Sequence, residues 1–307
     1  MKLHQLRYIT EVANRDLNVS EAAESLFTSQ PGVSKQIRLL ESEIGVPIFM
    51  RAGKRLTQIT PAGEQILKRA RNILKEVESI KHIGNEFRDE QSGNLTIATT
   101  HTQARYFLPN IIKNFVGRFP KVKLSLKQGY PEEITEMVVE GFADMVLATE
   151  AVSNSSELVA LPCYEWNRCA LMLPDHPLLK IKKVTLEDIA RYPIITYDFA
   201  FAGRTLVSET FEHAKLEPNI VFTALDSDVI KTYVELGIGV GLVATMAYDE
   251  QKDKGLRMIN LDHLFSPSTT WVGLRKNGFL RSYVYSFIEQ LAPNLKPEAV
   301  QAAVQAE

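Results

Sequence analysis

The 307-residue sequence is poor in the features that mark membrane, secreted and metal-binding proteins. It has two cysteines, Cys163 and Cys169, whose spacing fits neither a zinc ribbon nor a redox pair, and a reducing cytosol disfavours a disulfide between them. It contains no run of about 18 apolar residues that could cross a membrane, and its N-terminus lacks the apolar core of a signal peptide. We therefore expect a cytoplasmic protein with inert thiols, no membrane segment, no metal and no cofactor.

The sequence also lacks an excess of positive charge. Its formal net charge of -2 argues against a protein that coats nucleic acid or membranes through bulk charge. Between Lys35 and Arg71, however, eight basic residues stand against three acidic ones. This local excess predicts a basic patch, with a merely solvated surface as the simpler alternative. The length predicts two domains, and 45% hydrophobic residues are enough to give each of them a core.

Residues 1–60 show short helices followed by a small ribbon. Apolar residues at helical spacing predict three helices, and Pro31 lies in the first turn of the third, after a turn at Phe27–Ser29. The three apolar stripes are Leu6, Ile9, Val12 and Ala13; Val19, Ala22, Ala23 and Leu26; and Val33, Ile37, Leu40 and Ile44. From Val46 to Thr57 the pattern is typical of a hairpin with a tight turn at Gly53. We therefore predict a winged helix-turn-helix domain over residues 1–60.

Residues 61–92 predict one long linker helix. Its apolar residues repeat at spacings of four and three, which is typical of a helix that packs against another helix. They are Ile66, Ala70, Ile73, Val77, Ile80, Gly84 and Phe87. Because an isolated helix cannot cover such a stripe, a second copy of the chain is favoured as its partner over the C-terminal domain. The linker therefore predicts at least a dimer.

Residues 93–307 show short apolar strands that alternate with amphipathic helices. The predicted strands are Leu95–Thr99, Val122–Lys127, Met145–Thr149, Ala170–Leu173, Ile194–Thr196, Ile220–Ala224, Val240–Val243 and Trp271–Arg275. Such alternation predicts parallel-dominated α/β sheets, and the length predicts two lobes with a cleft between them. The expected fold class is an α/β effector domain of two Rossmann-like subdomains, arranged like a periplasmic binding protein, joined to an N-terminal all-α winged helix-turn-helix domain.

Short motifs in about the first 65 residues resemble the DNA-binding domain of LysR-type regulators. The motifs are Ala22-Ala23, Ser29-Gln30-Pro31-Gly32-Val33-Ser34, Phe49-Met50-Arg51, Leu56-Thr57 and Thr60-Pro61-Ala62-Gly63. Their combination of helix spacing, wing and linker is far more specific than a helix-turn-helix alone. The resemblance implies a transcriptional regulator that binds double-stranded promoter DNA, with RNA polymerase as a further candidate partner.

The chemistry of the third helix and the ribbon indicates which side chains would contact DNA. Residues on the first turns of a recognition helix contact base edges in the major groove, while basic residues farther along and on a wing hold phosphates or enter the minor groove. The base-contact candidates are Gln30, Pro31, Ser34 and Lys35, and the phosphate or minor-groove candidates are Arg38, Arg51, Lys54 and Arg55.

Three later segments resemble the regulators of cysteine biosynthesis and sulfur assimilation, the CysB and Cbl group. They are Ile97–Tyr106, Leu161–Arg168 and Asp228–Val234, and the similarity runs through almost the whole chain. It implies a homotetramer, built as a dimer of dimers, that responds to acetylserines, with sulfate or thiosulfate as alternative anionic ligands. A LysR-type regulator of another pathway, with a different small-molecule effector, is the alternative.

Thr100, Thr102 and Gln103 directly follow a predicted strand and precede a helix, which is where α/β sheets bind ligands. Free N–H groups and the positive end of the helix dipole favour an anion there, and the hydroxyls add donors. A plain threonine helix cap is the alternative. By resemblance, the same cleft also includes Thr149, Trp166 and Ala202. At Ala202 the group has a hydroxyl residue, so this chain loses one side-chain donor, which bears on affinity and ligand choice.

Two other function classes fit the sequence less well. His101 lies beside the threonines, but it has no acid–base partner at motif spacing, which favours a structural histidine over a catalytic one. An enzyme with a fused regulatory domain would need a nucleophile and a base that the sequence does not reveal. A solute-binding protein would need a signal peptide and no winged domain. We therefore predict a regulator and not an enzyme.

Overall fold

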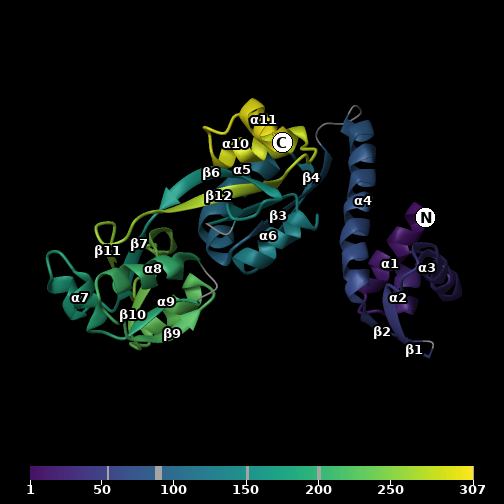
Figure 1. Ribbon diagram of the computed structural model, residues 1–307. Helices are drawn as coiled ribbons and strands as arrows, with labels where there is room; N and C mark the ends of the chain where they lie inside the picture. The colour runs from purple at the N-terminus through teal and green to yellow at the C-terminus, as the bar shows by residue number, and fades with distance from the viewer. Residues whose placement is uncertain (54, 87–91, 150–151, 199–201, 307) are drawn as a thin grey trace. The chain divides into compact units, whose positions relative to one another are not determined.

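The computed structural model describes residues 1–53, 55–86, 92–149, 152–198 and 202–306. The chain divides into two compact units, Met1–Asp89 and Glu90–Glu307, and each has its own hydrophobic core (Figure 1). Among the described residues, no helix combines the length and the apolar character that a membrane crossing requires.

The N-terminal unit contains a helix-turn-helix and a two-stranded hairpin. Its elements are α1 (Leu3–Asn14), α2 (Val19–Ser25), α3 (Gln30–Ile44), β1 (Phe49–Ala52), β2 (Arg55–Ile59) and α4 (Pro61–Glu86). Most residues of the three predicted stripes meet in one core, in which Ile9, Ala22 and Val33 are fully buried, whereas Ile44 at the end of α3 is exposed. β1 and β2 are antiparallel, and Gly53 at their turn has φ +63°, which favours glycine. The winged helix-turn-helix is thus confirmed.

The motif Thr60–Gly63 fixes the start of α4. The Thr60 hydroxyl donates to the Pro47 carbonyl (2.7 Å) and accepts from the Gly63 amide (2.8 Å), so that it caps α4 and ties it to the chain before the hairpin. A Cβ on Gly63 would overlap the backbone carbonyl of Ile48. The close approach of the helix to that backbone therefore requires glycine.

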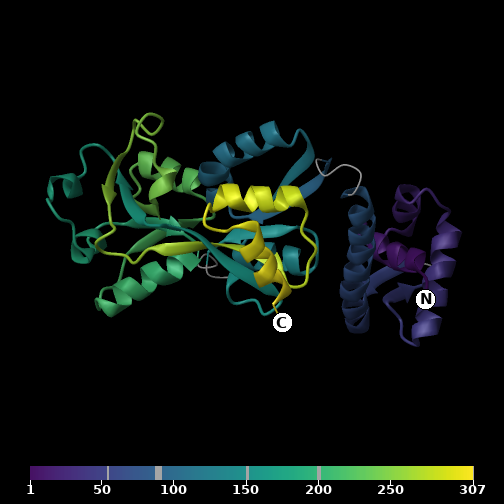
Figure 2. The same ribbon diagram turned by 90° about the horizontal axis from the view of Figure 1, so that it is seen from above.

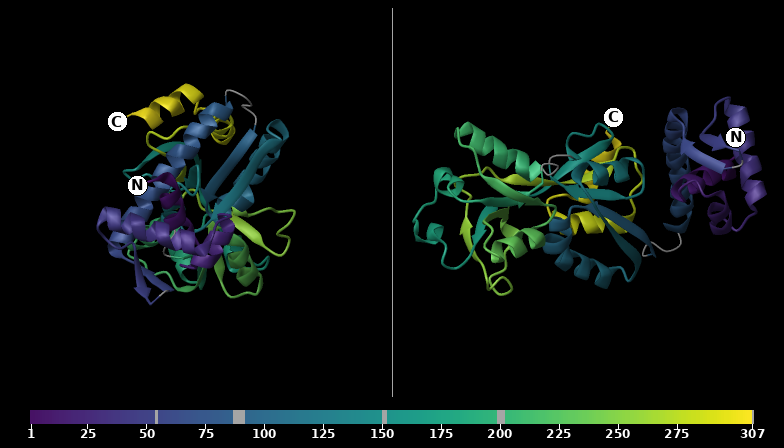
Figure 3. Two further views of the ribbon diagram at one scale, coloured as in Figure 1. Left: turned by 90° about the vertical axis from the view of Figure 1, so that its right-hand side faces the viewer. Right: turned by 90° about the horizontal axis from the view of Figure 1, so that it is seen from below.

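The α4 helix packs against its own unit over its first half. Leu67 and Ala70 are buried in the N-terminal core, and α4 lies alongside α1 (Figure 3). The predicted stripe is therefore divided, because Ala70 is buried within the unit whereas Ile73 and Ile80 are exposed, Ile80 by 69%. The sequence analysis did not foresee this packing of α4 on α1.

The C-terminal unit has two lobes, each built on a five-stranded sheet. Lobe I has the strand order β4-β3-β5-β12-β6 and contains β3 (Ser92–Thr99), the π-helical turn η1 (Gln103–Phe107), α5 (Leu108–Arg118), β4 (Lys121–Gln128), α6 (Pro131–Val139), β5 (Met145–Ala148), β6 (Leu158–Trp166), β12 (Ser268–Arg275), α10 (Ser282–Leu291) and α11 (Pro297–Gln305). Helices α5, α10 and α11 cover one face of this sheet and α6 covers the other (Figures 1 and 2).

Lobe II has the strand order β11-β7-β10-β8-β9. Its elements are β7 (Arg168–Met172), η3 (Pro177–Lys180), α7 (Leu186–Ala190), β8 (Ile194–Tyr197), α8 (Ala202–His213), β9 (Ile220–Ala224), α9 (Ser227–Glu235), β10 (Val240–Ala244), η4 (Thr245–Ala247) and β11 (Arg257–Asn260). Helices α7 and α8 pack on one face and α9 on the other, so the central strands are buried on both faces. The chain crosses from lobe I to lobe II after β6 and returns before β12.

The expected two-lobed α/β fold is confirmed, but the expectation of parallel-dominated sheets is wrong. In each sheet two strand pairs are parallel and two are antiparallel. The antiparallel pairs involve the strands next to the two crossings, where the chain runs back between the lobes. Two strands that the sequence analysis missed, β6 and β11, lie at sheet edges. Pro162 within β6 is compatible with that position, because an edge strand tolerates the missing N–H.

Candidate DNA interface and effector site

The exposed face of α3 brings together the residues predicted to contact bases. Ser29 caps the helix by accepting from the Gly32 amide (3.3 Å), and the buried side of α3 packs into the core. On the opposite side a shallow hollow is lined by Gln30, Pro31, Ser34, Lys35, Arg38, Leu39 and Ser42. All five predicted α3 residues therefore share one solvent-facing surface, without carboxylates among the residues that line it.

The hairpin extends this surface. Arg55 on β2 lines a second hollow together with Gln30, so Gln30 borders both. That second hollow also includes Arg15 and Ser20, from the turn between α1 and the start of α2. The sequence analysis did not propose Arg15 or Ser20. The only signal was their position around Asn18, whose side chain caps α2.

Arg51 and Lys54 are the other two hairpin residues predicted to contact DNA. The Arg51 guanidinium is paired with Glu41, with Nη2 2.7 Å from Oε2, and the Arg51 side chain is 27% exposed. Glu41 also accepts from the amides of Ile48 (2.9 Å) and Phe49 (3.1 Å). Arg51 is therefore held by the protein, and its contact with DNA stays a prediction. Lys54 lies outside the described residues.

In lobe I the predicted effector residues gather at one edge of the sheet. β3 and β5 are parallel neighbours, so Thr100 and Thr149, which follow them, lie at adjacent carboxyl ends. β12 pairs with both β5 and β6, which places Trp166, at the end of β6, on the same edge. Thr100 and Thr149 are buried. This edge is the one from which the chain crosses into lobe II.

Trp166 carries the clearest sign of a ligand position. Its indole Nε1 is buried and has no hydrogen-bond partner among the described residues. A buried donor without an acceptor typically costs about 1–3 kcal/mol, so such groups point to a missing acceptor. The guanidinium of Arg168, a residue only 2% exposed that the sequence analysis did not propose, lies 4.9 Å from the Trp166 ring centroid. The guanidinium lies over the face of the ring and donates to the Ser268 hydroxyl (3.0 Å), whereas the indole N–H lies in the ring plane and remains without an acceptor. A buried cation close to an orphan donor suits a ligand with anionic oxygens.

Of the other predicted effector residues, Thr102 and Gln103 already form hydrogen bonds within the protein. Gln103 is 3% exposed, and it donates to Thr270 (3.4 Å) and accepts from the Tyr164 hydroxyl, both within lobe I. Thr102 lies at the start of η1 and hydrogen-bonds with Tyr197 of lobe II. The Ala202 side chain lies outside the described residues. The roles of Thr102, Gln103 and Ala202 as effector contacts stay predictions.

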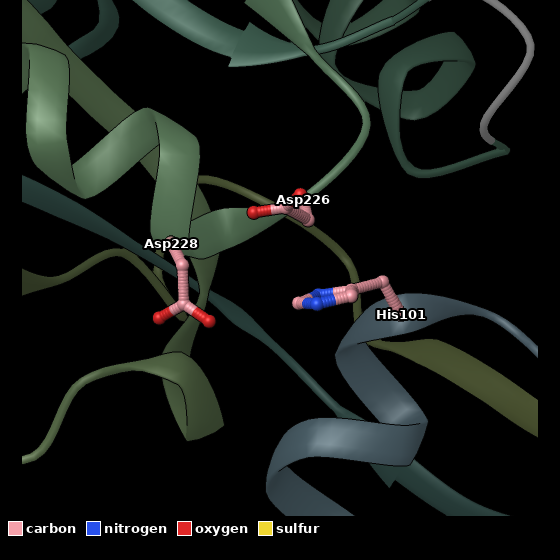
Figure 4. Close-up of side chains that lie close together, drawn as sticks. All are labelled: His101, Asp226 and Asp228. Carbon is pink, nitrogen blue, oxygen red and sulfur yellow. The ribbon is translucent and has the colours of Figure 1, made fainter. Parts of the chain in front are cut away.

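His101 lies at the junction of the two lobes. Its imidazole points toward the carboxylates of Asp226 and Asp228, and the three possible ligand atoms lie within 4.8 Å of one another (Figure 4). Asp226 caps α9 by accepting from the Val229 amide (2.8 Å), and Asp228 accepts from Tyr106 and is paired with Arg105. Both carboxylates therefore already serve the protein, and the buried Nδ1 of His101 has no hydrogen-bond partner among the described residues.

The two cysteines are free thiols, as predicted. Burial raises the pKa of Cys163 and of Cys169 to about 12, so both stay protonated at neutral pH. A protonated, desolvated thiol is a poor nucleophile.

Comparison with known proteins places both units in one group. Residues 3–64 match the family described as "Bacterial regulatory helix-turn-helix protein, lysR family", and residues 88–296 match "LysR substrate binding domain". The chain is 50% identical over 307 residues to the transcriptional regulator CysB of Burkholderia cenocepacia, covering 100% of this chain and 98% of that protein. It is 45% identical to the transcriptional regulator cbl of Escherichia coli K12 over 304 residues, covering 99% and 96%.

Two solved structures are similar to this chain. The cofactor-binding domain of the Cbl transcriptional regulator superposes with a TM-score of 0.69 at 44% identity, over 71% of this chain and 96% of that one. Full-length OxyR from Pseudomonas aeruginosa superposes with a TM-score of 0.72 over 99% of this chain and 96% of that one. At 20% identity the second match supports the fold alone.

Proposed function

The chain belongs to the LysR family of transcriptional regulators and is not an enzyme, and we propose that it binds promoters of sulfur-assimilation and cysteine-biosynthesis genes under the control of a small anionic effector. Residues 1–60 would bind DNA, residues 61–92 would dimerise, and residues 93–307 would bind the effector. The effector would be N-acetylserine or O-acetylserine, or alternatively sulfate or thiosulfate.

The DNA-binding part of this proposal is supported by the shared face of α3 and the hairpin. Lys35 and Arg55 are both exposed and lie on the surface that Gln30 joins. Each phosphate contact on duplex DNA contributes about 0.9 to the slope of log affinity against log salt concentration. We expect Lys35→Ala and Arg55→Ala each to lower that slope by about this amount, whereas exposed Lys113 in the C-terminal unit serves as the matched Lys113→Ala control. Unchanged slopes in both test variants would remove these residues from the interface.

The effector part is supported above all by the orphan indole N–H of Trp166. Sulfate, thiosulfate and the carboxylate of an acetylserine all offer acceptors to that donor and to the hydroxyls of Thr100 and Thr149. An anion is further favoured by the buried Arg168 guanidinium. The relatives that carry the names CysB and cbl support the sulfur-related pathway over another pathway.

The proposed oligomer is supported by the surface of α4. The exposed Ile73 and Ile80 leave an apolar strip that a second α4 would cover, and two such dimers would form the tetramer. We propose that effector binding changes the arrangement of the two lobes and thereby of the DNA-binding units, with RNA polymerase as the recipient of the signal. The coupling cannot exceed the difference in effector affinity between the two arrangements.

The deciding experiment is footprinting on sulfur-assimilation promoters with N-acetylserine, thiosulfate or sulfate present in turn. We expect protection of promoter fragments over random duplex of equal length and a changed footprint with at least one of the three. Promoter binding that no effector alters would favour a different pathway and ligand. A lack of preference for any promoter over random duplex would overturn the proposal.

A further inference from the structure

A hydrogen bond joins the two lobes between two segments that carry the resemblance, Ile97–Tyr106 and Asp228–Val234. The Tyr106 hydroxyl, on η1 in lobe I, donates to Asp228 Oδ1 on α9 in lobe II at 2.6 Å. Arg105, next to it on η1, places Nε 3.2 Å from Asp228 Oδ2. The Tyr106 ring also packs against the apolar cluster beneath α9, and η1 contacts η4. One turn of lobe I is thus docked on lobe II by an ion pair, a hydrogen bond and an apolar contact.

Lobe II holds Asp228 in place for this contact. Lys231 Nζ lies 3.4 Å from Asp228 Oδ1 and 3.1 Å from Asp253 Oδ1, and it donates to the Ala247 carbonyl (3.1 Å). Its ammonium lies 5.2 Å from the centroid of the Tyr106 ring. Lys231 therefore fixes the carboxylate from one side and contacts the incoming aromatic ring from the other, so the acceptor is already positioned when lobe I approaches.

The ionisation states of Tyr106 and Asp228 favour a strong hydrogen bond at neutral pH. Burial favours a raised pKa for Asp228, but the Tyr106 hydroxyl, Lys231 and Arg105 outweigh it, and the pKa lies below the usual value. Burial, assisted by the Asp228 acceptor, raises the pKa of Tyr106 to about 12. At neutral pH a neutral phenol therefore donates to an ionised carboxylate, which is the strong form of such a hydrogen bond.

The same turn connects this contact to the effector site. Thr102 directly precedes η1, Gln103 is its first residue and Tyr106 lies near its end, so the predicted effector contacts and the contact between lobes stand within residues 102–106. We propose that Tyr106 and Asp228 form an interlobe latch, which stabilises the arrangement of the lobes that binds effector and so sets effector affinity without touching the effector. This inference rests on the proposed function, since it concerns the regulation of the same site.

The expected loss of effector affinity follows from the populations of the two lobe arrangements. The apparent dissociation constant equals the intrinsic one divided by the fraction of molecules in the binding-competent arrangement. A hydrogen bond to a charged group is generally worth about tenfold to a hundredfold in an equilibrium constant, and the partial exposure of Asp228 reduces this to the lower end or below. We therefore expect loss of the latch to weaken effector binding by about threefold to tenfold, with no change in the ligand contacts themselves.

The test is a double-mutant cycle on the full chain. Tyr106→Phe removes only the hydroxyl, and Asp228→Asn keeps the size of the side chain while it removes the charge. Titration calorimetry with N-acetylserine, thiosulfate and sulfate in turn should show each variant weakened, and the double variant no weaker than Asp228→Asn alone. Asp249→Asn and Tyr248→Phe are matched controls, because their side-chain contacts stay within lobe II and involve neither Asp228 nor Lys231, and they should keep wild-type affinity. Additive losses, or none, would overturn the latch.

A ligand-free measurement separates this inference from the proposed function. Amide hydrogen exchange over residues 101–107 and 226–232 should be at least threefold faster in Tyr106→Phe and Asp228→Asn than in the wild type and the two controls. If the wild type binds none of the three anions, the proposed effector class fails, and exchange alone still decides the latch. Equal exchange in all variants would refute it.

Discussion

A single buried carboxylate, Glu41, should determine whether the hairpin is held against the recognition helix. It is 8% exposed, and its two oxygens accept from two backbone amides, of Ile48 and Phe49, and from the Arg51 guanidinium. In Glu41→Gln one oxygen remains for the amides, whereas the new NH₂ group would meet the guanidinium donor to donor. Hydrogen bonds to charged groups are worth about 1.5–3 kcal/mol each, so we expect the free energy of unfolding of the N-terminal unit to fall by roughly 2–3 kcal/mol.

The two units can be followed separately during denaturation. Both tryptophans, Trp166 and Trp271, lie in the C-terminal unit, so their fluorescence reports that unit alone, whereas far-UV circular dichroism also reports α1 to α4. Glu41→Gln should move the circular dichroism transition of the N-terminal unit to lower denaturant and leave the tryptophan transition unchanged. Amide exchange at Ile48 and Phe49 should accelerate at the same time.

The matched control is Glu43→Gln, two residues away on the same helix. The Glu43 side chain is 52% exposed, and among the described residues it pairs with the N-terminal amine, so Glu43→Gln should change stability by less than about 0.5 kcal/mol. If both variants unfold alike, or if the amides of Ile48 and Phe49 keep their protection in Glu41→Gln, the assignment of Glu41 as the clamp of the hairpin is wrong.

Three further changes test other contacts. Gly63→Ala should lower the free energy of unfolding of the N-terminal unit by about 1–3 kcal/mol in chemical denaturation, because the new Cβ would overlap the backbone of Ile48. The control is Gly117→Ala, whose Cβ would have no atom within 4 Å, and it should be neutral or stabilising. Equal effects of the two substitutions would contradict the close approach at Gly63. Trp166→Phe should weaken N-acetylserine binding by roughly threefold to tenfold in calorimetry, because phenylalanine lacks the indole N–H; unchanged affinity would remove the indole from the site. Ile80→Glu should shift the sedimentation coefficient toward that of the monomer, because it places a charge on the apolar strip of α4. The exposed Gln65→Glu on the same helix is the control and should leave the dimer intact. A dimer that Ile80→Glu leaves unchanged would exclude this strip as the dimer interface.

The sequence predicted what local rules determine. The stripes of α1, α2 and α3 follow helical spacing, Gly53 supplies the turn of the hairpin, and the buried central strands appear as short apolar runs. The edge strands β6 and β11 were missed because an edge strand need not be apolar on both faces, and β6 contains a proline. Strand direction was misjudged because direction depends on where the chain crosses between lobes, which no local pattern records.

The functional residues, too, differ in whether a local sequence pattern could have identified them. Glu41 was counted as one more surface charge, yet its spacing of four from Ile37 places it on the buried stripe of α3, so this signal was present in the sequence. The segments that contain Tyr106 and Asp228 carry the resemblance, but no local pattern shows that the two residues meet. They lie 122 positions apart and come together because the chain crosses to lobe II and packs α9 beside η1. A local pattern can therefore place the residues predicted to contact DNA on one helix and one hairpin, whereas the contact of Tyr106 with Asp228 is determined by long-range topology. Substitutions at Tyr106 or Asp228 should accordingly change the effector response while the affinity of the N-terminal unit for DNA stays the same.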